Sequence, residues 1–382
     1  MTASSPQSGV AAPASTGPVA PHGGGGAPAG TKPAPVPILG LSGVAREYKP
    51  SGDVVDRVAR MLQGRPALKP VQAVADVDLD IQAGEVVGVV GESGCGKTTL
   101  GRMLAGILAP SRGRILYRGH DVSQLSGAAR RKYELDIQMI FQDPFSSLNP
   151  RMRVLDIIGE APLAHGLVAR HDKESYVCEL MRKVGLDPAY RYRYPHQFSG
   201  GQRQRIGVAR ALALKPSIIV CDEAVAALDV SIQAQVLNLF VQLREEFGLT
   251  YFFISHNLGV VGHISDRVAI MYLGRVVELA PTDAIFGTAR HPYTQALLKE
   301  LPSLGTGQRQ FEPIKGELPS PMDPPAGCPF HPRCPRAMAR CSRERPVLRQ
   351  VAGPAQAPAD GRDTRHFSAC HLDDEAPPAN LL

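Results

Sequence analysis

The apolar positions of this chain fall into short runs and helical stripes, and the clearest run and stripe follow one another. The run Val86–Val90 has no polar side chain, as expected of a strand in a sheet that is covered on both faces. After it, apolar residues recur with the spacing of one helix face at Leu100, Met103, Leu104, Ile107 and Leu108. This pattern predicts a strand, a glycine-rich turn and a helix.

Two more apolar runs predict buried strands later in the chain, at Ser217–Cys221 and Thr250–Ile254. Between them lies a second helical stripe, for which Ser231 is a candidate N-cap and Gly248 a candidate end. Alternating strands and helices predict an α/β fold with an open, mostly parallel sheet. Residues from about 143 to 212 contain mainly helix and loop patterns, which predicts an inserted helical subdomain.

Both ends of the chain lack such patterns. Residues 1–37 contain 30 Gly, Ala, Pro, Ser or Thr and no acidic residue, so they cannot bury enough apolar surface to offset their ordering entropy. We expect a disordered tail there. From Pro302 on, the chain holds 14 of its 34 prolines and shows little periodicity. We expect this segment to be either disordered or held by something other than a core.

Composition limits the class of protein. Of the 382 residues, 43% are apolar and 20% charged, which suits a globular protein with a sizeable core. There is no uncharged run of 18 apolar residues and no secretory signal at the N-terminus, so we expect a cytoplasmic location. The net charge of +6 permits a nucleic acid partner without arguing for one, and the lack of Trp disfavours a base-stacking surface. We expect no nucleic acid partner.

A phosphate-binding motif stands between the first predicted strand and its helix. It has the form G-x-x-x-x-G-K-[ST] and comprises Gly91, Glu92, Ser93, Gly94, Cys95, Gly96, Lys97 and Thr98, followed by Thr99. Its glycines let backbone N–H groups turn inward as an anion nest at a helix N-terminus. Lys97 can reach the β- and γ-phosphates, and the Thr98 hydroxyl can ligate Mg²⁺. We interpret Cys95 as a small loop residue rather than a redox site.

Acidic residues follow the second predicted strand. Asp222 and Glu223 come directly after an apolar run, at the carboxyl end where ligands bind in open α/β sheets. We expect Asp222 to hold Mg²⁺ through water and Glu223 to polarise the attacking water. His256 follows the next strand and should lie on the same rim, where it can contact the γ-phosphate. The alternative interpretation is a solvated acidic turn beside a structural histidine.

The segment Phe198-Ser199-Gly200-Gly201-Gln202 resembles the L/F-S-G-G-Q signature of the ATP-binding subunits of ABC transporters. Ser199 and the two glycines open a helix, which presents N–H groups and a positive dipole end to a phosphate. In that family this helix faces the nucleotide of the other subunit. The resemblance therefore implies that Ser199, Gly200, Gly201 and Gln202 complete a site that exists only in a dimer.

The same resemblance assigns three further residues. Gln142 matches the glutamine that links Mg²⁺ to the helical subdomain, and Asp229 matches the aspartate that communicates across the dimer. Tyr48 is the candidate for the aromatic residue that stacks on adenine, and an insertion-like stretch, Gly52–Lys69, separates it from the core. One departure is the absence of a small hydroxyl residue at Ala226, which is expected to weaken a hydrogen bond near the dimer interface.

Two segments are similar to one group of ABC transporters, the oligopeptide and dipeptide importers and their nickel relatives. They are Asp143–Arg151, after the glutamine, and Gly327–Pro335, in the tail. The resemblance implies an ATP-hydrolysing subunit on the cytoplasmic face of the bacterial inner membrane that powers peptide import. Its implied partners are a second ATPase subunit (a paralogue or a copy of itself), two permease subunits and an extracytoplasmic solute-binding protein. The alternatives are import of nickel or another small solute, or a soluble ABC ATPase that acts on ribosomes or DNA.

Four of the seven cysteines lie in the tail, with gaps of five, six and 28 residues, at Cys328, Cys334, Cys341 and Cys370. Four thiolates suit an iron–sulfur cluster or a tetrahedral zinc ion, and four unrelated thiols are the alternative. The resemblance to the peptide-importer tail implies a four-iron cluster, and its distance in sequence from the ATP-site residues favours a structural role. The expected domains are thus a tail over 1–37, an ABC ATPase domain over 38–300, and a cysteine-bearing C-terminal extension over 301–382.

Overall fold

We analysed a computed structural model of the full chain, in which residues 36–49, 70–143, 147–301, 314, 316–352 and 363–374 are described. Residues 1–35 of the tail predicted over 1–37, and the insertion-like stretch Gly52–Lys69, therefore lie outside the described residues. Among the described residues an eight-stranded sheet has the order β11-β12-β10-β9-β3-β8-β7-β6, and a four-stranded sheet has the order β2-β1-β4-β5.

The strands of the larger sheet are short and the central ones are parallel. Pairs β9–β3, β3–β8, β8–β7 and β7–β6 run parallel, whereas β10, β11 and β12 add antiparallel pairs at one end. Their bounds are β3 Val86–Val90, β6 Ile137–Ile140, β7 Ile218–Asp222, β8 Thr250–Ser255, β9 Arg267–Tyr272, β10 Arg275–Pro281, β11 Arg349–Ala352 and β12 His366–Ser368. The predicted α/β class with a mostly parallel sheet is confirmed.

Alternate residues of the central strands belong to two separate cores. In β3, Val86 and Val90 pack in one buried cluster and Val87 and Val89 in the other. The same alternation holds in β7 and β8, so both faces of the sheet are covered, as the unbroken apolar runs predict. One core contains the helix that follows the phosphate loop, Tyr133 and the four-stranded sheet; the other contains side chains of the helices between residues 154 and 299.

The antiparallel sheet has no counterpart in the sequence prediction. It comprises β1 Leu39–Tyr48, β2 Val71–Ile81, β4 Arg112–Tyr117 and β5 His120–Asp121. Its buried residues, such as Leu39, Val77 and Ile115, pack in the same core as α2, which spans Lys97–Leu104. Irregular register at several points along β1 breaks the alternation that a sequence pattern would show.

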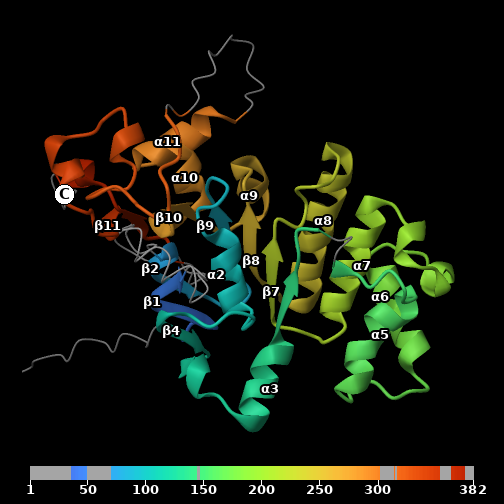
Figure 1. Ribbon diagram of the computed structural model, residues 1–382. Coiled ribbons are helices and arrows are strands. Elements are labelled where there is room, and N and C mark those ends of the chain that lie inside the picture. The colour runs from blue at the N-terminus through green and yellow to red at the C-terminus, as the bar shows by residue number, and fades with distance from the viewer. Residues whose placement is uncertain are drawn as a thin grey trace, which may run out of the picture. The chain divides into compact units, whose positions relative to one another are not determined.

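The helices lie on both sides of the larger sheet and beyond its β6 end. They are α2, α3 Gly127–Asp136, α5 Val154–Ala164, α6 Lys173–Lys183, α7 Gly200–Leu212, α8 Val230–Phe247, α9 Leu258–Ile264, α10 Thr282–Thr288 and α11 Pro292–Lys299. Figure 1 shows α5, α6 and α7 grouped beyond β7, and the C-terminal extension beside α10 and α11 at the other end. Between β6 and β7, the described residues after Asp143 form helices, turns and loops.

Two helix boundaries differ from the prediction. Helix α2 ends at Leu104 rather than including Ile107 and Leu108, because Gly106 takes a φ of +71° that stops the helix and leaves Ile107 57% exposed. The N-cap of α8 is Asp229 rather than Ser231, which lies inside the helix. Gly248 ends α8 in the left-handed conformation, as predicted.

The C-terminal extension packs on the main core. Cys328, Phe330 and Cys341 are buried members of the core that contains α5 to α9. Strand β12 pairs with β10 and thereby extends the larger sheet. The expectation that this segment is disordered or held by something other than a core is therefore wrong for its described residues, because its few apolar side chains are spread too irregularly for a periodic pattern to reveal them.

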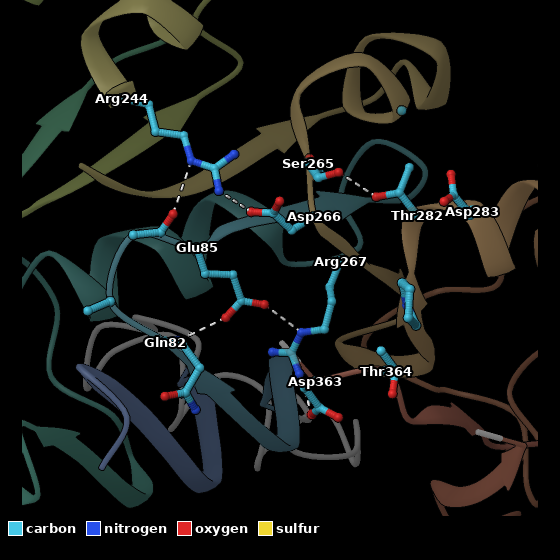
Figure 2. A pocket seen from close by; sticks show the side chains of 14 residues that line it. Gln82, Glu85, Arg244, Ser265, Asp266, Arg267, Thr282, Asp283, Asp363 and Thr364 are labelled. Carbon is cyan, nitrogen blue, oxygen red and sulfur yellow. Dashed lines mark hydrogen bonds and ion pairs between the residues drawn. The ribbon is translucent and has the colours of Figure 1, made fainter. Parts of the chain in front are cut away.

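A network of ion pairs joins segments at the amino end of the parallel strands. Arg267 contacts Glu85 at 2.6 Å and Asp363 of the extension at 2.7 Å, and Arg244 contacts Asp266 (Figure 2). These residues line a cavity of about 630 Å³ on the edge opposite the carboxyl ends of β3, β7 and β8. Because these charged side chains pair with one another, we interpret the network as a structural contact that holds these segments together.

Candidate nucleotide-binding site

The phosphate loop is wedged against the backbone of two other strands. Gly94 and Gly96 have φ values of +80° and +104°, in the region that favours glycine. A Cβ at Gly96 would lie 2.1 Å from the carbonyl oxygen of Ala73, and one at Gly91 would lie 2.1 Å from that of Met271. Glycine is thus required at both positions, since the loop has no room for a side chain there.

Lys97 is held inside this loop. Its Nζ donates hydrogen bonds to the carbonyl oxygens of Gly91 at 2.7 Å and Glu92 at 3.0 Å, and the residue is only 5% exposed. The sulfur of Cys95 lies 3.8 Å from the same nitrogen, and burial raises the pKa of that thiol. A buried, protonated Cys95 fits the interpretation of a small packing residue. The ammonium group of Lys97 therefore lies within the phosphate loop.

Thr98 and Asp222 meet at the start of α2. The Thr98 hydroxyl donates to Asp222 Oδ1 at 2.8 Å. Burial raises the pKa of Asp222, the hydrogen bond from Thr98 opposes that rise, and the nearby carboxylate of Glu223 adds to it. Both residues line a cavity of about 410 Å³, together with Arg102, Phe141, Gln142, Asp143 and Ser147. Hydroxyl, carboxylate and amide oxygens are the donors that Mg²⁺ prefers, so this set fits that ion.

Glu223 lies at the centre of a second group on the same edge. It has a φ of +47° and follows β7 directly. Gln142 Nε2 donates to its Oε2 at 2.8 Å, and His256 Nδ1 lies 3.5 Å from the same oxygen. The parallel register of β6, β7 and β8 brings together three residues that are far apart in sequence. The Glu223 side chain is 16% exposed and that of His256 56%, so the histidine is the more open to a ligand.

The signature segment starts α7, apart from the phosphate loop. Ser199 is the N-cap, accepts a hydrogen bond from the Gln202 N–H at 3.4 Å, and forms a capping box with that residue. Ser199 and Gly200 are exposed. An added Cβ at Gly201 would lie 2.4 Å from Ile232 of α8, whereas at Gly200 the nearest atom is 3.7 Å away. Gly201 thus serves the packing of α7 on α8, and Gly200 presents open backbone.

Asp229 and Tyr48 are the outer members of the predicted set. Asp229 is exposed at the start of α8, close in sequence to Ile232, which packs against the signature helix. Tyr48 ends β1, is 39% exposed and pairs with Val71 of β2. Val71 lies two residues before Ala73, which touches the phosphate loop. The aromatic ring is therefore on the strand pair that flanks the loop.

The prediction of a metal centre in the tail is wrong. The described residues, which include Cys328, Cys334, Cys341 and Cys370, contain no group of three or more His, Cys, Asp or Glu side chains able to hold a metal ion. The four cysteines line a cavity of only about 10 Å³. Burial raises the pKa of Cys328 to about 11 and of Cys370 to about 12, and it raises that of Cys334. Burial therefore favours the neutral thiol at these three positions.

Two residues near the phosphate loop were missed by the sequence prediction. The Tyr293 hydroxyl accepts a hydrogen bond from the backbone N–H of Glu92 at 2.9 Å. Arg333 of the extension contacts both carboxylate oxygens of Glu92 at 2.8 and 3.0 Å. No signal in the sequence could have found these contacts, because 201 and 241 positions separate the partners.

The fold and the phosphate loop define a P-loop nucleotide-binding protein, and comparisons with known proteins narrow that class. A protein-family model described as ABC transporter matches residues 74–226 of this chain. A second family model, described as oligopeptide/dipeptide transporter, C-terminal region, matches residues 277–341. The oligopeptide transport ATP-binding protein AppF of Bacillus subtilis is 50% identical over 79% of this chain and 90% of its own. The dipeptide transport ATP-binding protein DppF of Escherichia coli is 47% identical over 74% of this chain and 85% of its own.

Solved structures of ABC transporter proteins also match the fold of this chain. An ATP-binding cassette solved as a dimer in a post-hydrolysis state with ADP and Pi matches with a TM-score of 0.54 and 26% identity, over 64% of this chain and 99% of that one. A subunit of an ABC transporter complex from Clostridium perfringens gives a TM-score of 0.54 at 25% identity, over 66% of this chain and 91% of that one. This chain belongs to the ATP-binding proteins of ABC transporters, in the group with the oligopeptide/dipeptide transporter C-terminal region. Within the described ranges no helix is long and apolar enough to cross a membrane.

Proposed function

We propose that this chain is the ATP-hydrolysing subunit that powers the import of di- or oligopeptides across the bacterial inner membrane. The observation that carries the ATPase assignment is the meeting of Glu223, Gln142 and His256 beside the Thr98–Asp222 pair. The peptide substrate is supported by relatives of about 50% identity that are oligopeptide and dipeptide transport proteins. The peptide itself would be bound by partner subunits, so its length is not encoded in this site.

In this proposal the residues around the loop bind and orient ATP. The loop from Gly91 to Thr99 cradles the phosphates through backbone N–H groups other than those of Glu92 and Cys95, which donate to the Tyr293 hydroxyl and to the Glu92 carbonyl oxygen. Lys97 supplies positive charge to the phosphates. Tyr48 stacks on the adenine. Thr98, Asp222 and Gln142 hold Mg²⁺, which when bound neutralises charge on the phosphate oxygens.

Glu223 is the proposed group that orients and polarises the attacking water. Gln142 donates to one of its oxygens and so sets the direction of the carboxylate. His256, whose Nδ1 lies 3.5 Å from the Glu223 carboxylate at the neighbouring strand end, is proposed to donate to the γ-phosphate. Because phosphoryl transfer depends mainly on positioning and electrostatics, small displacements of these three groups should matter more to turnover than to ATP affinity.

The signature helix is proposed to act on the nucleotide of a partner cassette. Ser199 and Gly200 are exposed at the positive end of α7, which supports a role at an interface. Gly201 and Gln202 shape that helix start, and Asp229 is exposed beside it. The complex would also hold two permease subunits and an extracytoplasmic binding protein, with this chain on the cytoplasmic face of the membrane.

The proposed domain limits follow the sequence. A tail covers residues 1–37, the ATPase domain residues 38–300 with a helical subdomain at about 143–212, and the C-terminal region residues 301–382. The matches to two family models at 74–226 and 277–341 support the order of the last two parts.

The test is ATP hydrolysis and peptide uptake by the assembled transporter in proteoliposomes. We expect Glu223→Gln to keep ATP binding and to trap a closed dimer. Its turnover should be at least about tenfold lower, which corresponds to an activation free energy higher by roughly 1.4 kcal/mol. Lys97→Ala should weaken ATP binding itself. Glu134→Gln, which changes an exposed glutamate paired with Arg130, is the matched control. Near-normal turnover of Glu223→Gln removes that residue from its role, and uptake of a nickel salt in place of a labelled dipeptide contradicts the substrate class.

A further inference from the structure

The C-terminal extension reaches the phosphate loop through one side chain. Arg333 ends a short 3-10 helix, His331–Arg333, and its Nη1 donates to both carboxylate oxygens of Glu92. The same nitrogen donates to the Tyr272 hydroxyl at 3.3 Å. The Arg333 side chain is 7% exposed and that of Glu92 25%, so the ion pair is largely shielded from water.

Arg333 is held in place by an aromatic cluster. Phe330, three residues earlier, is 1% exposed, and its ring centroid lies 5.3 Å from those of both Tyr272 and Tyr293. The Phe330 carbonyl accepts a hydrogen bond from the Arg333 N–H at 2.9 Å. The backbone at Arg333 is thus anchored by the packing of Phe330 on β9 and α11, and the guanidinium group contacts Tyr272 of β9 as well as its partner carboxylate.

Glu92 is therefore fixed from several sides at once. Arg333 holds its carboxylate, Tyr293 accepts from its N–H, and Lys97 donates to its carbonyl oxygen. Glu92 follows Gly91 directly, in the loop whose N–H groups form the proposed anion nest. An unpaired carboxylate at this position would repel the phosphates of ATP, and a displaced Glu92 would move the carbonyl that meets Lys97.

We propose that Arg333 is a positioning residue that couples the C-terminal extension to ATP binding. It neutralises Glu92 and keeps its carboxylate turned toward the extension, so that the phosphate loop accepts an anion. This inference rests on the proposed ATPase function and adds to it a second role for the extension. Any event that displaces the segment from Phe330 to Arg333 would lower ATP affinity through the same contact.

The alternative is that Arg333 only attaches the extension to the domain, and a double-mutant cycle separates the two. We would measure KM for ATP and kcat in the assembled transporter, with full-length chains carrying Arg333→Gln, Glu92→Gln or both changes. The expected result is a KM for ATP about five- to tenfold higher in Arg333→Gln, with kcat within about twofold. In the Glu92→Gln background the same change should alter KM less than about twofold, because no carboxylate remains to be neutralised.

The matched control is Arg340→Gln, which removes an arginine of the same extension that pairs with Glu344 and Asp374, away from the loop. It should leave KM within about twofold of the unmodified complex. Arg333→Lys should restore part of the affinity, because it keeps the charge and most of the side-chain stem. Thermal unfolding of each variant, read by circular dichroism, shows whether the chain is folded, and Arg333→Lys supplies the comparison if Arg333→Gln is not.

The proposal is overturned if Arg333→Gln raises KM equally in both backgrounds, or no more than Arg340→Gln does. Either result would leave the ATPase assignment intact, since the unmodified complex would still hydrolyse ATP and Glu223→Gln would still lower its turnover at least about tenfold. Failure of the unmodified complex to hydrolyse ATP would instead refute the proposed function, on which this inference depends.

Discussion

Replacing His291 with Asn should flatten the dependence of folding stability on pH between about pH 5 and about pH 7.5. His291 is 1% exposed and is the N-cap of α11, where its Nδ1 accepts the Tyr293 N–H at 3.1 Å. A protonated imidazole could not accept that hydrogen bond. Burial lowers the pKa of His291 to about 4, although the negative charges of Glu278 and Asp373 act in the opposite direction.

The size of the effect follows from the difference between the folded pKa of about 4 and the ordinary value of 6.5. As the pH falls below 6.5, the unfolded chain binds a proton that the folded chain does not. The contribution of neutral His291 to stability is therefore complete above that value and is lost as the pH falls toward 4. The full difference corresponds to about 3 kcal/mol, of which about 2 kcal/mol is lost by about pH 5.

Urea unfolding of the full chain, followed by circular dichroism at several pH values, measures this loss. Asn is a good N-cap, so His291→Asn should fold, with a constant penalty for its smaller volume at every pH. The original chain should lose about 2 kcal/mol more than the variant between about pH 7.5 and about pH 5. His120→Asn, at an exposed histidine, should behave like the original chain. Parallel pH curves for the original chain and His291→Asn would refute the reasoning.

Three other predictions concern the site and the extension. Gly200→Ala should spare ATP affinity in the isolated chain, because an added Cβ has no atom closer than 3.7 Å, yet lower turnover of the assembled complex at least about tenfold; equal loss of affinity in the lone chain would contradict action on a partner's nucleotide. Thr98→Val should raise the Mg²⁺ concentration needed for half-maximal hydrolysis by about tenfold, since the hydroxyl beside Asp222 is lost, and an unchanged Mg²⁺ titration would exclude that ligand. Phe330→Ala should lower the free energy of unfolding by about 3 kcal/mol or more in urea, and a loss below about 1 kcal/mol would show that the extension does not share the core.

The sequence determined the parts of the fold that rest on local pattern. Unbroken apolar runs are typical of strands buried on both faces, and β3, β7 and β8 agree with the prediction to within one residue at each end. The phosphate motif places its glycines where the backbone needs positive φ or has no room for a Cβ. Side chains that follow parallel strands meet at one edge of the sheet. The sequence alone therefore predicted that Asp222, Glu223 and His256 lie at the same edge.

The tertiary structure determined the features of this protein that the hydrophobic periodicity of the sequence does not show. Strand β1 has too irregular a register for its sheet to be predicted from a sequence pattern. In the extension, a few core residues such as Phe330 are scattered among prolines and charged residues, so no periodic pattern marks them. The number of tail cysteines suggested a metal site, yet the described residues contain no group of side chains able to hold a metal ion, which only the packing reveals. The contact between Arg333 and Glu92 spans 241 positions. Patterns along a chain describe neighbours within one strand or helix, whereas such a contact depends on how separate elements pack against each other.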